Sequence, residues 1–173
     1  MHALSGPRKQ ELPKNECGLG ANLNMLLHKA IEDGMKLFFQ MDDDHVLKVP
    51  LDLNQHVEKL LTDEDVGWIR LMNIGGHKYE ATLVGIYWQI HWDSPELYIP
   101  SNRPHLKHIR FLSTFGFYPV GKTLGETEEG YCHQCKDIAK KFKYKVPYVL
   151  VPLGVRTEDS WDHVGDSWQR KGE

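Results

Sequence analysis

Three consecutive aspartates, Asp42, Asp43 and Asp44, offer the clearest candidate chemistry in this sequence. They follow the apolar run 37–41, which is too short for a helix and is typical of a β-strand covered on both faces. Adjacent carboxylates repel one another unless a cation neutralises them. Because hard divalent cations prefer oxygen ligands, Asp42 and Asp44 are candidate metal ligands. Alternation along a strand turns the side chain of Asp43 the opposite way.

The position of these acids is as informative as their charge. In an open α/β sheet, ligands bind beyond the carboxyl ends of the strands, and the three aspartates come directly after such an end. The alternative interpretation is a solvated acidic turn that leads into a helix beginning at Pro50. The spacing of the acids alone does not separate these two interpretations.

Helices and strands alternate along the chain, which predicts an α/β fold with a mostly parallel central sheet flanked by helices. Apolar residues at helical spacing predict helices from about residue 18 to Gly34, over 50–61, from Pro104 to Gly116, and over about 127–142. Short runs rich in β-formers predict strands over 37–41, 66–72, 83–90 and 146–151. Pro147 lies within the last of these runs and predicts that this strand is at a sheet edge.

Composition narrows the class of protein. The 173 residues fit one domain, and 40% hydrophobic with 26% charged residues is the mix of an ordinary globular protein. A net charge of -3 predicts no nucleic-acid partner. No apolar run reaches the ~20 residues of a membrane helix, and no signal-peptide core is present. We therefore expect a cytoplasmic protein, with the inner face of the membrane as the alternative location, and an irregular leader over residues 1–14.

An ordered set of segments resembles the GT-A glycosyltransferases, specifically the family-2 group of inverting enzymes. Residues 15–24 (NECGLGANLN) are similar to the Asn/Gly-rich opening of the helix before the acidic strand, and 36–44 (KLFFQMDDD) to the strand that ends in D-x-D. Residues 106–122 resemble the helix and turn that precede the acceptor-side acid. Residues 125–129 (GETEE) resemble the acidic pair that carries the base, and 162–165 (DHVG) the late His-Gly segment.

The resemblance implies transfer of a sugar from a nucleotide diphosphate sugar to the hydroxyl of a carbohydrate or other acceptor, with Mn²⁺ or Mg²⁺ as cofactor. The ion would neutralise charge on the departing phosphates. The residues at matching positions are, for the metal, Asp44, Asp42 and His163, and, for the nucleotide sugar, Asp42, Asp43 and Asn24. Without the resemblance, His163 would be interpreted as a surface histidine.

The resemblance also implies a catalytic base at Glu129, with Glu128 as its acidic neighbour. The family usually has aspartate at the base position, so glutamate is a departure. The alternative is that both acids simply favour the first turn of a helix, where the helix dipole stabilises each by about 0.3–1 kcal/mol. Trp88 and Trp92 are candidate acceptor-binding platforms for a sugar ring, and core packing is the alternative for both.

Family members begin with a strand, a helix and a strand that form much of the nucleotide-binding half. Only about forty residues precede Asp42 here, so we expect a partial GT-A domain over residues 15–173 that lacks the N-terminal part. Two alternatives to an active transferase stay open. One is a non-catalytic family member that binds carbohydrate or a partner chain. The other is a metal-dependent hydrolase that uses Asp42, Asp44 and His163.

Overall fold

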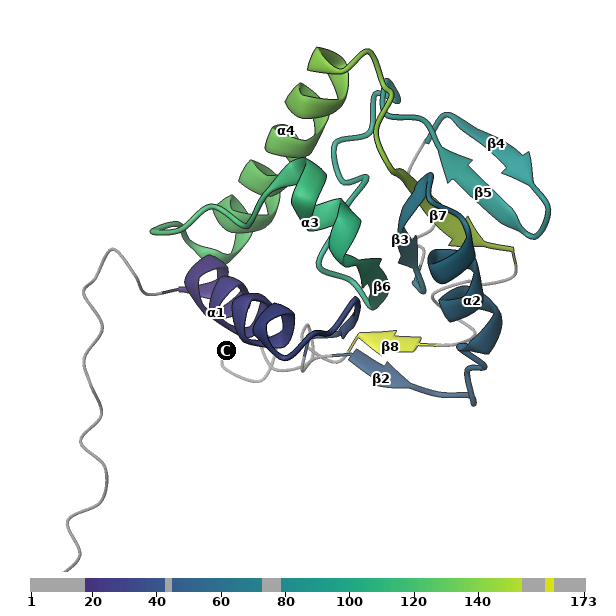
Figure 1. The fold of residues 1–173 in the computed structure, drawn as a ribbon, viewed down its shortest axis with the longest axis horizontal. Coiled ribbons are helices and arrows are strands. Elements are labelled where there is room, and N and C mark those ends of the chain that lie inside the picture. Colours follow the sequence, from purple (N-terminus) through teal and green to yellow (C-terminus); the bar gives the residue numbers. More distant parts are fainter. Residues whose placement is uncertain (1–17, 43–44, 73–78, 154–160, 164–173) are drawn as a thin grey trace, which may run out of the picture.

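The structure is a computed structural model that describes residues 18–42, 45–72, 79–153 and 161–163. The expected leader, Asp43 and Asp44 lie outside the described residues. The described part is an α/β fold with a six-stranded sheet, helices on both faces and a separate two-stranded sheet (Figure 1). The α/β class is therefore confirmed.

The six-stranded sheet is mixed, and the prediction of a mostly parallel sheet is wrong. Its strands, in spatial order, are β1 (Leu37–Gln40), β6 (His105–His108), β3 (Val66–Arg70), β7 (Tyr148–Pro152), β5 (Tyr87–Ile90) and β4 (Ala81–Val84). Only β3 and β7 pair in parallel, and the other four pairings are antiparallel. These pairings give β1, β3, β7 and β4 one direction, while β6 and β5 run the opposite way.

Three local features account for the difference. The expected single strand over 83–90 is a hairpin, because Gly85 takes a positive φ of 60° and turns the chain between β4 and β5. Residues after Pro104 form the antiparallel strand β6 before the helix begins. Pro147 precedes β7 instead of interrupting it, so β7 lies between β3 and β5 and is not an edge strand.

The helices are α1 (Leu19–Glu32), α2 (Asn54–Thr62), α3 (Ile109–Phe115) and α4 (Leu124–Lys141). The first and last agree closely with the sequence prediction. Capping fixes two of them: the His108 ring accepts from the backbone N–H of Arg110 at the start of α3, and Thr123 with Glu126 forms a capping box at the start of α4. None of the described helices combines the length and the apolar character that a membrane crossing requires.

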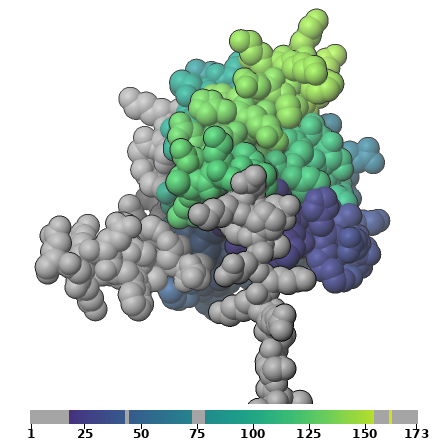
Figure 2. Space-filling model, turned by 90° about the vertical axis from the view of Figure 1, so that its left-hand side faces the viewer, coloured from purple at the N-terminus to yellow at the C-terminus, as the bar shows by residue number. Residues whose placement is uncertain are grey.

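Two apolar cores lie on the two faces of the sheet. Side chains such as Trp68 and Phe111 pack on one face with α1, α3 and α4, and the surfaces of α1 and α4 adjoin on the outside (Figure 2). Leu60, Ile69 and Trp161 pack on the other face. There α2 lies beside the small sheet of β2 (His45–Leu47) and β8 (Trp161–His163).

Candidate functional site

The carboxyl ends of β1, β3 and β7 lie at the same edge of the sheet because these strands run in the same direction. Asp42 is partly buried and follows the last residue of β1 by two positions, so it lies at this edge. The strand itself differs from the prediction. β1 is at one edge of the six-stranded sheet, as β4 is at the other, and Phe39 is 49% exposed, so the run is not covered on both faces.

The small sheet brings a distant segment to the acidic run. His45, which directly follows Asp44 in the sequence, is the Cα partner of His163 in the antiparallel pair of β2 and β8. Directly opposite Cα atoms in such a pair are about 4.5–5.5 Å apart. The main chain at His163 therefore lies beside the segment that continues from the aspartates. Because Asp43, Asp44 and the His163 side chain are outside the described residues, their predicted roles stay predictions.

A row of polar side chains crosses three neighbouring strands at this edge. His105 of β6 is the register partner of both Gln40 of β1 and Arg70 of β3. Alternation places the row on the same face of the sheet as Trp68. Gln40 Nε2, His105 Nε2 and Arg70 Nε are buried and have no hydrogen-bond partner among the described residues; Trp68 Nε1 and Ser101 Oγ share this property. Such groups are rare in native proteins, because a buried polar atom without a partner costs free energy.

His105 contributes a hydrogen-bond acceptor to this row. Its Nδ1 donates to the carbonyl of Arg103 at 2.6 Å, and its ring stacks on Trp68 with 3.8 Å between centroids. Burial, followed by the nearby Lys107 ammonium, lowers the pKa of His105 well below its ordinary value. The ring is therefore neutral at pH 7, with Nε2 as a bare acceptor. The sequence had suggested that His105 lies in the first turn of a helix, and its place in β6 corrects that expectation.

Arg70 contributes a buried positive charge and is 1% exposed. One guanidinium nitrogen, Nη1, donates to the Tyr79 hydroxyl at 2.6 Å and to the Tyr98 carbonyl at 3.0 Å. No carboxylate of the described residues forms an ion pair with Arg70. Burying a charge without an opposite charge is costly, so this guanidinium is suited to an anionic group supplied by a ligand.

Lys107 and Tyr118 connect the row to Asp42. Lys107 Nζ donates to Gln40 Oε1 at 3.3 Å and to the Tyr118 hydroxyl at 3.2 Å. Burial lowers the pKa of Lys107 to about 7. Burial also raises the pKa of Tyr118; the hydrogen bond with Gln40 opposes the rise, and the Asp42 carboxylate adds to it. The negative charge of Asp42 therefore acts on Tyr118, which is hydrogen-bonded to Gln40 of the buried polar row.

The two predicted catalytic acids point in different directions from α4. Glu128 is partly buried, and its Oε1 accepts from the backbone N–H of Asn102 at 2.9 Å, on the loop that precedes β6. The Glu129 side chain is 54% exposed, and its Oε1 lies 3.7 Å from His133 Nε2. Burial raises the pKa of Cys132; the Glu128 carboxylate raises it further, and the Arg70 guanidinium lowers it. Glu128 and Arg70 therefore act on the same buried thiol.

The aromatic platform expected from Trp88 and Trp92 does not form. Trp88 is 41% exposed on β5, but Trp92 is 3% exposed and packs against Phe111 and Phe115 in the core. Its indole Nε1 donates to the Pro147 carbonyl at 3.1 Å. The prediction for Trp92 is wrong because the chain bends after β5 and carries this ring inward. Trp88 alone retains a face that a sugar could contact.

Asn24 holds the helix α1 to the segment after α3. Its Nδ2 donates to the Tyr118 carbonyl at 2.8 Å, and its Oδ1 accepts from the Tyr118 N–H at 2.9 Å. Both ends of the amide are engaged in this contact. The structure thus gives Asn24 a role in positioning Tyr118, and its predicted contact with a nucleotide stays a prediction.

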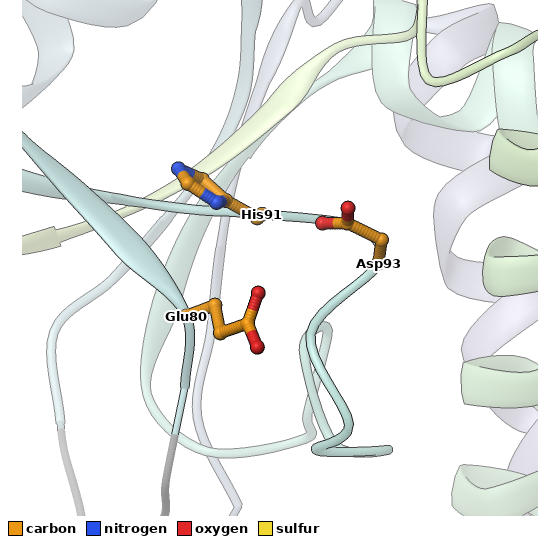
Figure 3. A group of neighbouring side chains, drawn as sticks. All are labelled: Glu80, His91 and Asp93. Atoms are coloured by element: carbon orange, nitrogen blue, oxygen red, sulfur yellow. The ribbon is translucent and has the colours of Figure 1, made fainter.

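Strand pairing assembles the buried polar row from three separate segments, so no single stretch of the sequence predicts it. A second group of metal-ligand side chains, Glu80, His91 and Asp93, lies at the start of β4 and just after β5 (Figure 3). Comparison of the chain with family models, curated proteins and solved structures found no match.

Proposed function

We propose that this protein is a glycosyltransferase that moves a sugar from a nucleotide diphosphate sugar to an acceptor hydroxyl, with Mn²⁺ or Mg²⁺ bound after β1. The observation that carries the proposal is the buried polar row beside Asp42. Within the described ranges, Gln40 and Arg70 offer donors without a partner, and His105 offers an acceptor without one. A sugar hydroxyl both donates and accepts, so a sugar can satisfy this mixed set. Each unmet group that gains a partner would recover about 1–3 kcal/mol of desolvation cost.

The residue types that the resemblance assigns to this site suit a divalent ion. Asp42 would hold it, together with Asp44 and His163 at the positions that the resemblance assigns. Carboxylate oxygens with an imidazole nitrogen are a donor set that suits Mn²⁺. The bound ion would supply neutralisation of negative charge on the diphosphate.

Arg70 is a protein group that could also neutralise negative charge on the diphosphate. In the reaction, the acceptor oxygen forms a bond to the anomeric carbon while the bond from that carbon to the diphosphate oxygen breaks. The nucleoside diphosphate leaves with the electron pair of that bond, so negative charge increases on its oxygens. A guanidinium that has no carboxylate partner among the described residues is suited to stabilise this charge.

The proton of the acceptor hydroxyl must pass to a base. Glu128 is the better candidate of the two adjacent acids, because the Asn102 N–H orients it and its second oxygen is left to accept a proton. Glu129 is largely in solvent beside His133. The proposal therefore exchanges the roles that the resemblance implied, with Glu128 as base and Glu129 as its neighbour.

The test is binding and turnover with UDP-sugars and GDP-sugars in the presence of Mn²⁺. Calorimetry should detect metal-dependent binding, and release of nucleoside diphosphate should require an acceptor. Asp42→Asn should abolish both. Asp65→Asn, an exposed aspartate at the opposite end of the sheet before β3, should change neither. Binding without transfer would favour a non-catalytic family member, and turnover without an acceptor would favour a hydrolase.

A further inference from the structure

The β4–β5 hairpin gathers three side chains that can ligate a metal. Ala81 and Ile90 are register partners, so Glu80 and His91 lie opposite each other at the base of the hairpin, and the His91 N–H donates to the Glu80 carbonyl at 2.8 Å. Asp93 follows two residues later. One donor atom from each of Glu80, His91 and Asp93 lies within 4.8 Å of the others, and Figure 3 shows the three side chains bordering one space.

This group is separate from the edge that carries Asp42. The outer strand β4 and its neighbour β5 are at the far side of the sheet from β1. With about 4.8 Å between neighbouring strands, β1 and β5 are roughly 19 Å apart. The group also lies at the amino end of β4, whereas Asp42 follows the carboxyl end of β1, which runs in the same direction.

The histidine is oriented by a neighbour outside the group. His91 Nε2 is 2.7 Å from the hydroxyl of Thr82 on β4. When Nε2 carries the proton and donates to that hydroxyl, Nδ1 is left as a neutral lone pair. Metal-bound histidines are commonly held in this way by a hydrogen bond at the other ring nitrogen, which fixes both tautomer and ring orientation.

The backbone that carries the group is fixed to the body of the protein. The buried Ser94 hydroxyl accepts from the Glu80 N–H at 3.0 Å, and the Ser94 N–H donates to the His91 carbonyl at 3.1 Å. Lys136 of α4 donates to the carbonyls of Ser94 and Glu96, at 2.6 and 3.1 Å. The segment that joins His91 to Asp93 is therefore tied to both β4 and α4.

A hollow of ≈ 380 Å³ adjoins the group on the side of Asp93. Asp93 itself lines it, together with Lys136, Lys140, His133 and Tyr144 from α4 and the residues after it. An ion held by three protein ligands keeps at least one position for water or an exogenous ligand. The hollow gives such a ligand space, and its lining carries both signs of charge, since Asp137 lies there with the two lysines.

We propose that Glu80, His91 and Asp93 form a binding site for a divalent transition-metal ion of the Zn²⁺ type. Donor atoms around a tetrahedral ion, at bonds of about 2.1 Å, are roughly 3.4 Å apart. The carboxylates of Glu80 and Asp93 are exposed, so burial does not restrict rotation of these side chains toward this spacing. The imidazole nitrogen favours Zn²⁺ over Mg²⁺ and Ca²⁺, which prefer all-oxygen sites. The expected order of affinity is Zn²⁺, then Mn²⁺, then Mg²⁺.

The test is titration of the metal-free full chain with Zn²⁺ by calorimetry, with Co²⁺ absorption as a second measurement that reports nitrogen and oxygen ligands directly. His91→Ala and Glu80→Gln should each weaken binding at this site at least ten-fold and remove the Co²⁺ bands. Thr82→Val, which leaves all three ligands, should weaken binding by about ten-fold. His28→Ala removes an exposed histidine on α1 and should change neither measurement.

Asp42→Asn separates this site from the proposed transferase site. If the inference is right, the Asp42→Asn variant keeps the binding event that His91→Ala removes, whether or not the chain has transferase activity. Zn²⁺ binding that is unchanged in His91→Ala, or that is lost in Asp42→Asn, would overturn it. Circular dichroism melts of each variant in chelator establish that the fold is retained, since these side chains are partly or largely exposed.

Discussion

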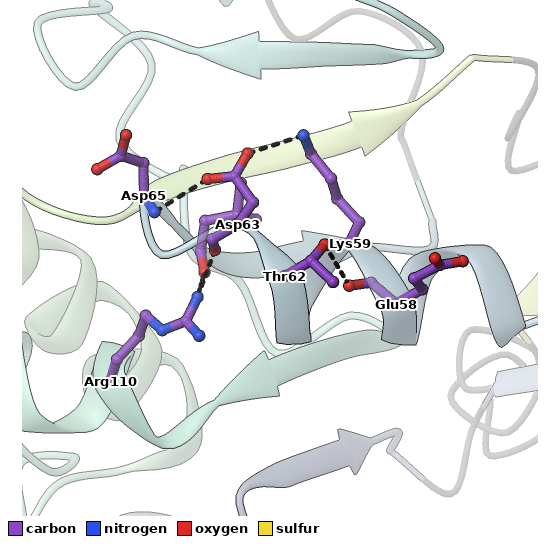
Figure 4. Close-up of polar contacts among 7 residues, drawn as sticks. Glu58, Lys59, Thr62, Asp63, Asp65 and Arg110 are labelled. Carbon is purple, nitrogen blue, oxygen red and sulfur yellow. Dashed lines mark hydrogen bonds and ion pairs between the residues drawn. The ribbon is translucent and has the colours of Figure 1, made fainter.

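Arg110 of α3 donates to the main-chain carbonyl of Val66, the first residue of β3, at 2.7 Å. The same guanidinium nitrogen donates to the carbonyl of Asp63, at the end of α2 (Figure 4). On the other side of this turn, Lys59 forms an ion pair with the Asp63 carboxylate at 2.7 Å, and the hydrogen bond from Lys59 is the main cause of a lowered Asp63 pKa. The helix after β6 thus fixes the start of β3, the strand that ends at Arg70.

Replacing Arg110 by methionine should destabilise the protein by about 1–3 kcal/mol, because two carbonyls at the α2–β3 turn each lose a charged donor, although the Asp63 carbonyl still accepts from the Val66 N–H. The measurement is urea unfolding followed by circular dichroism. Lys59→Met at the same turn is the matched control. Its ion pair is about one-third exposed on both sides, so its removal should cost under about 1 kcal/mol. Equal losses of unfolding free energy in the two variants would contradict the larger stabilising role of Arg110.

Lys107 makes stability depend on pH. Burial lowers its pKa to about 7 in the folded protein, from an ordinary value of 10.5. Between these values the unfolded chain holds the proton that the folded chain has lost, so stability rises with pH, with a slope of at most about 1.4 kcal/mol per pH unit. Below pH 7 both states are protonated and the slope disappears. Lys107→Met should flatten the rise measured by urea unfolding between pH 7 and 9.

Two buried cysteines set the upper limit of the pH range over which stability rises. Burial raises the pKa of Cys132 and Cys135 above the ordinary value of 9.0, so stability falls with pH where the unfolded thiols ionise. Both the wild type and Lys107→Met share this fall, and the difference between them isolates Lys107. Identical slopes in the two proteins would show that the lysine keeps its charge in the folded state.

Trp92→Ala should cost about 3–5 kcal/mol of unfolding free energy, since the ring is 3% exposed among Phe111 and Phe115. Trp88→Ala on β5, four residues earlier, removes a ring that is 41% exposed, and we expect a loss of about 1 kcal/mol or less. Thermal and urea unfolding compare the two. If Trp88 contacts the acceptor, its alanine variant should raise the acceptor KM while the unfolding midpoint changes little.

The sequence predicted the elements whose apolar spacing is unambiguous. Helix α1 ends near Gly34 as expected. Helix α4 covers most of the range, about 127–142, that the helical spacing of apolar residues predicted. Strand β6 was missed because its inward-facing residues are His105 and Lys107, which hydrophobic patterning assigns to the surface. Local rules fail most often at functional or strained positions. The two polar residues that made this strand hard to predict, His105 and Lys107, both belong to the candidate site.

The acidic run could be predicted from the sequence, and the buried polar row could not. Asp42 is recognisable because a short apolar run precedes it. The row formed by Gln40, His105 and Arg70 depends on strand register, which follows from the whole sheet. The sequence contained one indirect signal, the alternating polar residues after Pro104. The sequence does not reveal that β6 lies between β1 and β3. The burial of His105 and Lys107 and their proximity to Asp42 therefore could not be predicted.

Glu128 and Glu129 provide the sharpest test of the proposed chemistry, because they are adjacent in sequence and differ in environment. Glu128→Gln should lower kcat for sugar transfer by at least about a hundred-fold with little change in donor KM, because an amide cannot accept the acceptor proton. Its amide oxygen can still accept from Asn102 N–H, so the fold should be retained. Glu129→Gln, in solvent beside His133, should stay within about three-fold of wild type. A loss confined to Glu129→Gln would restore the role that the resemblance assigns to that residue. Equal activity in both variants would place the base elsewhere.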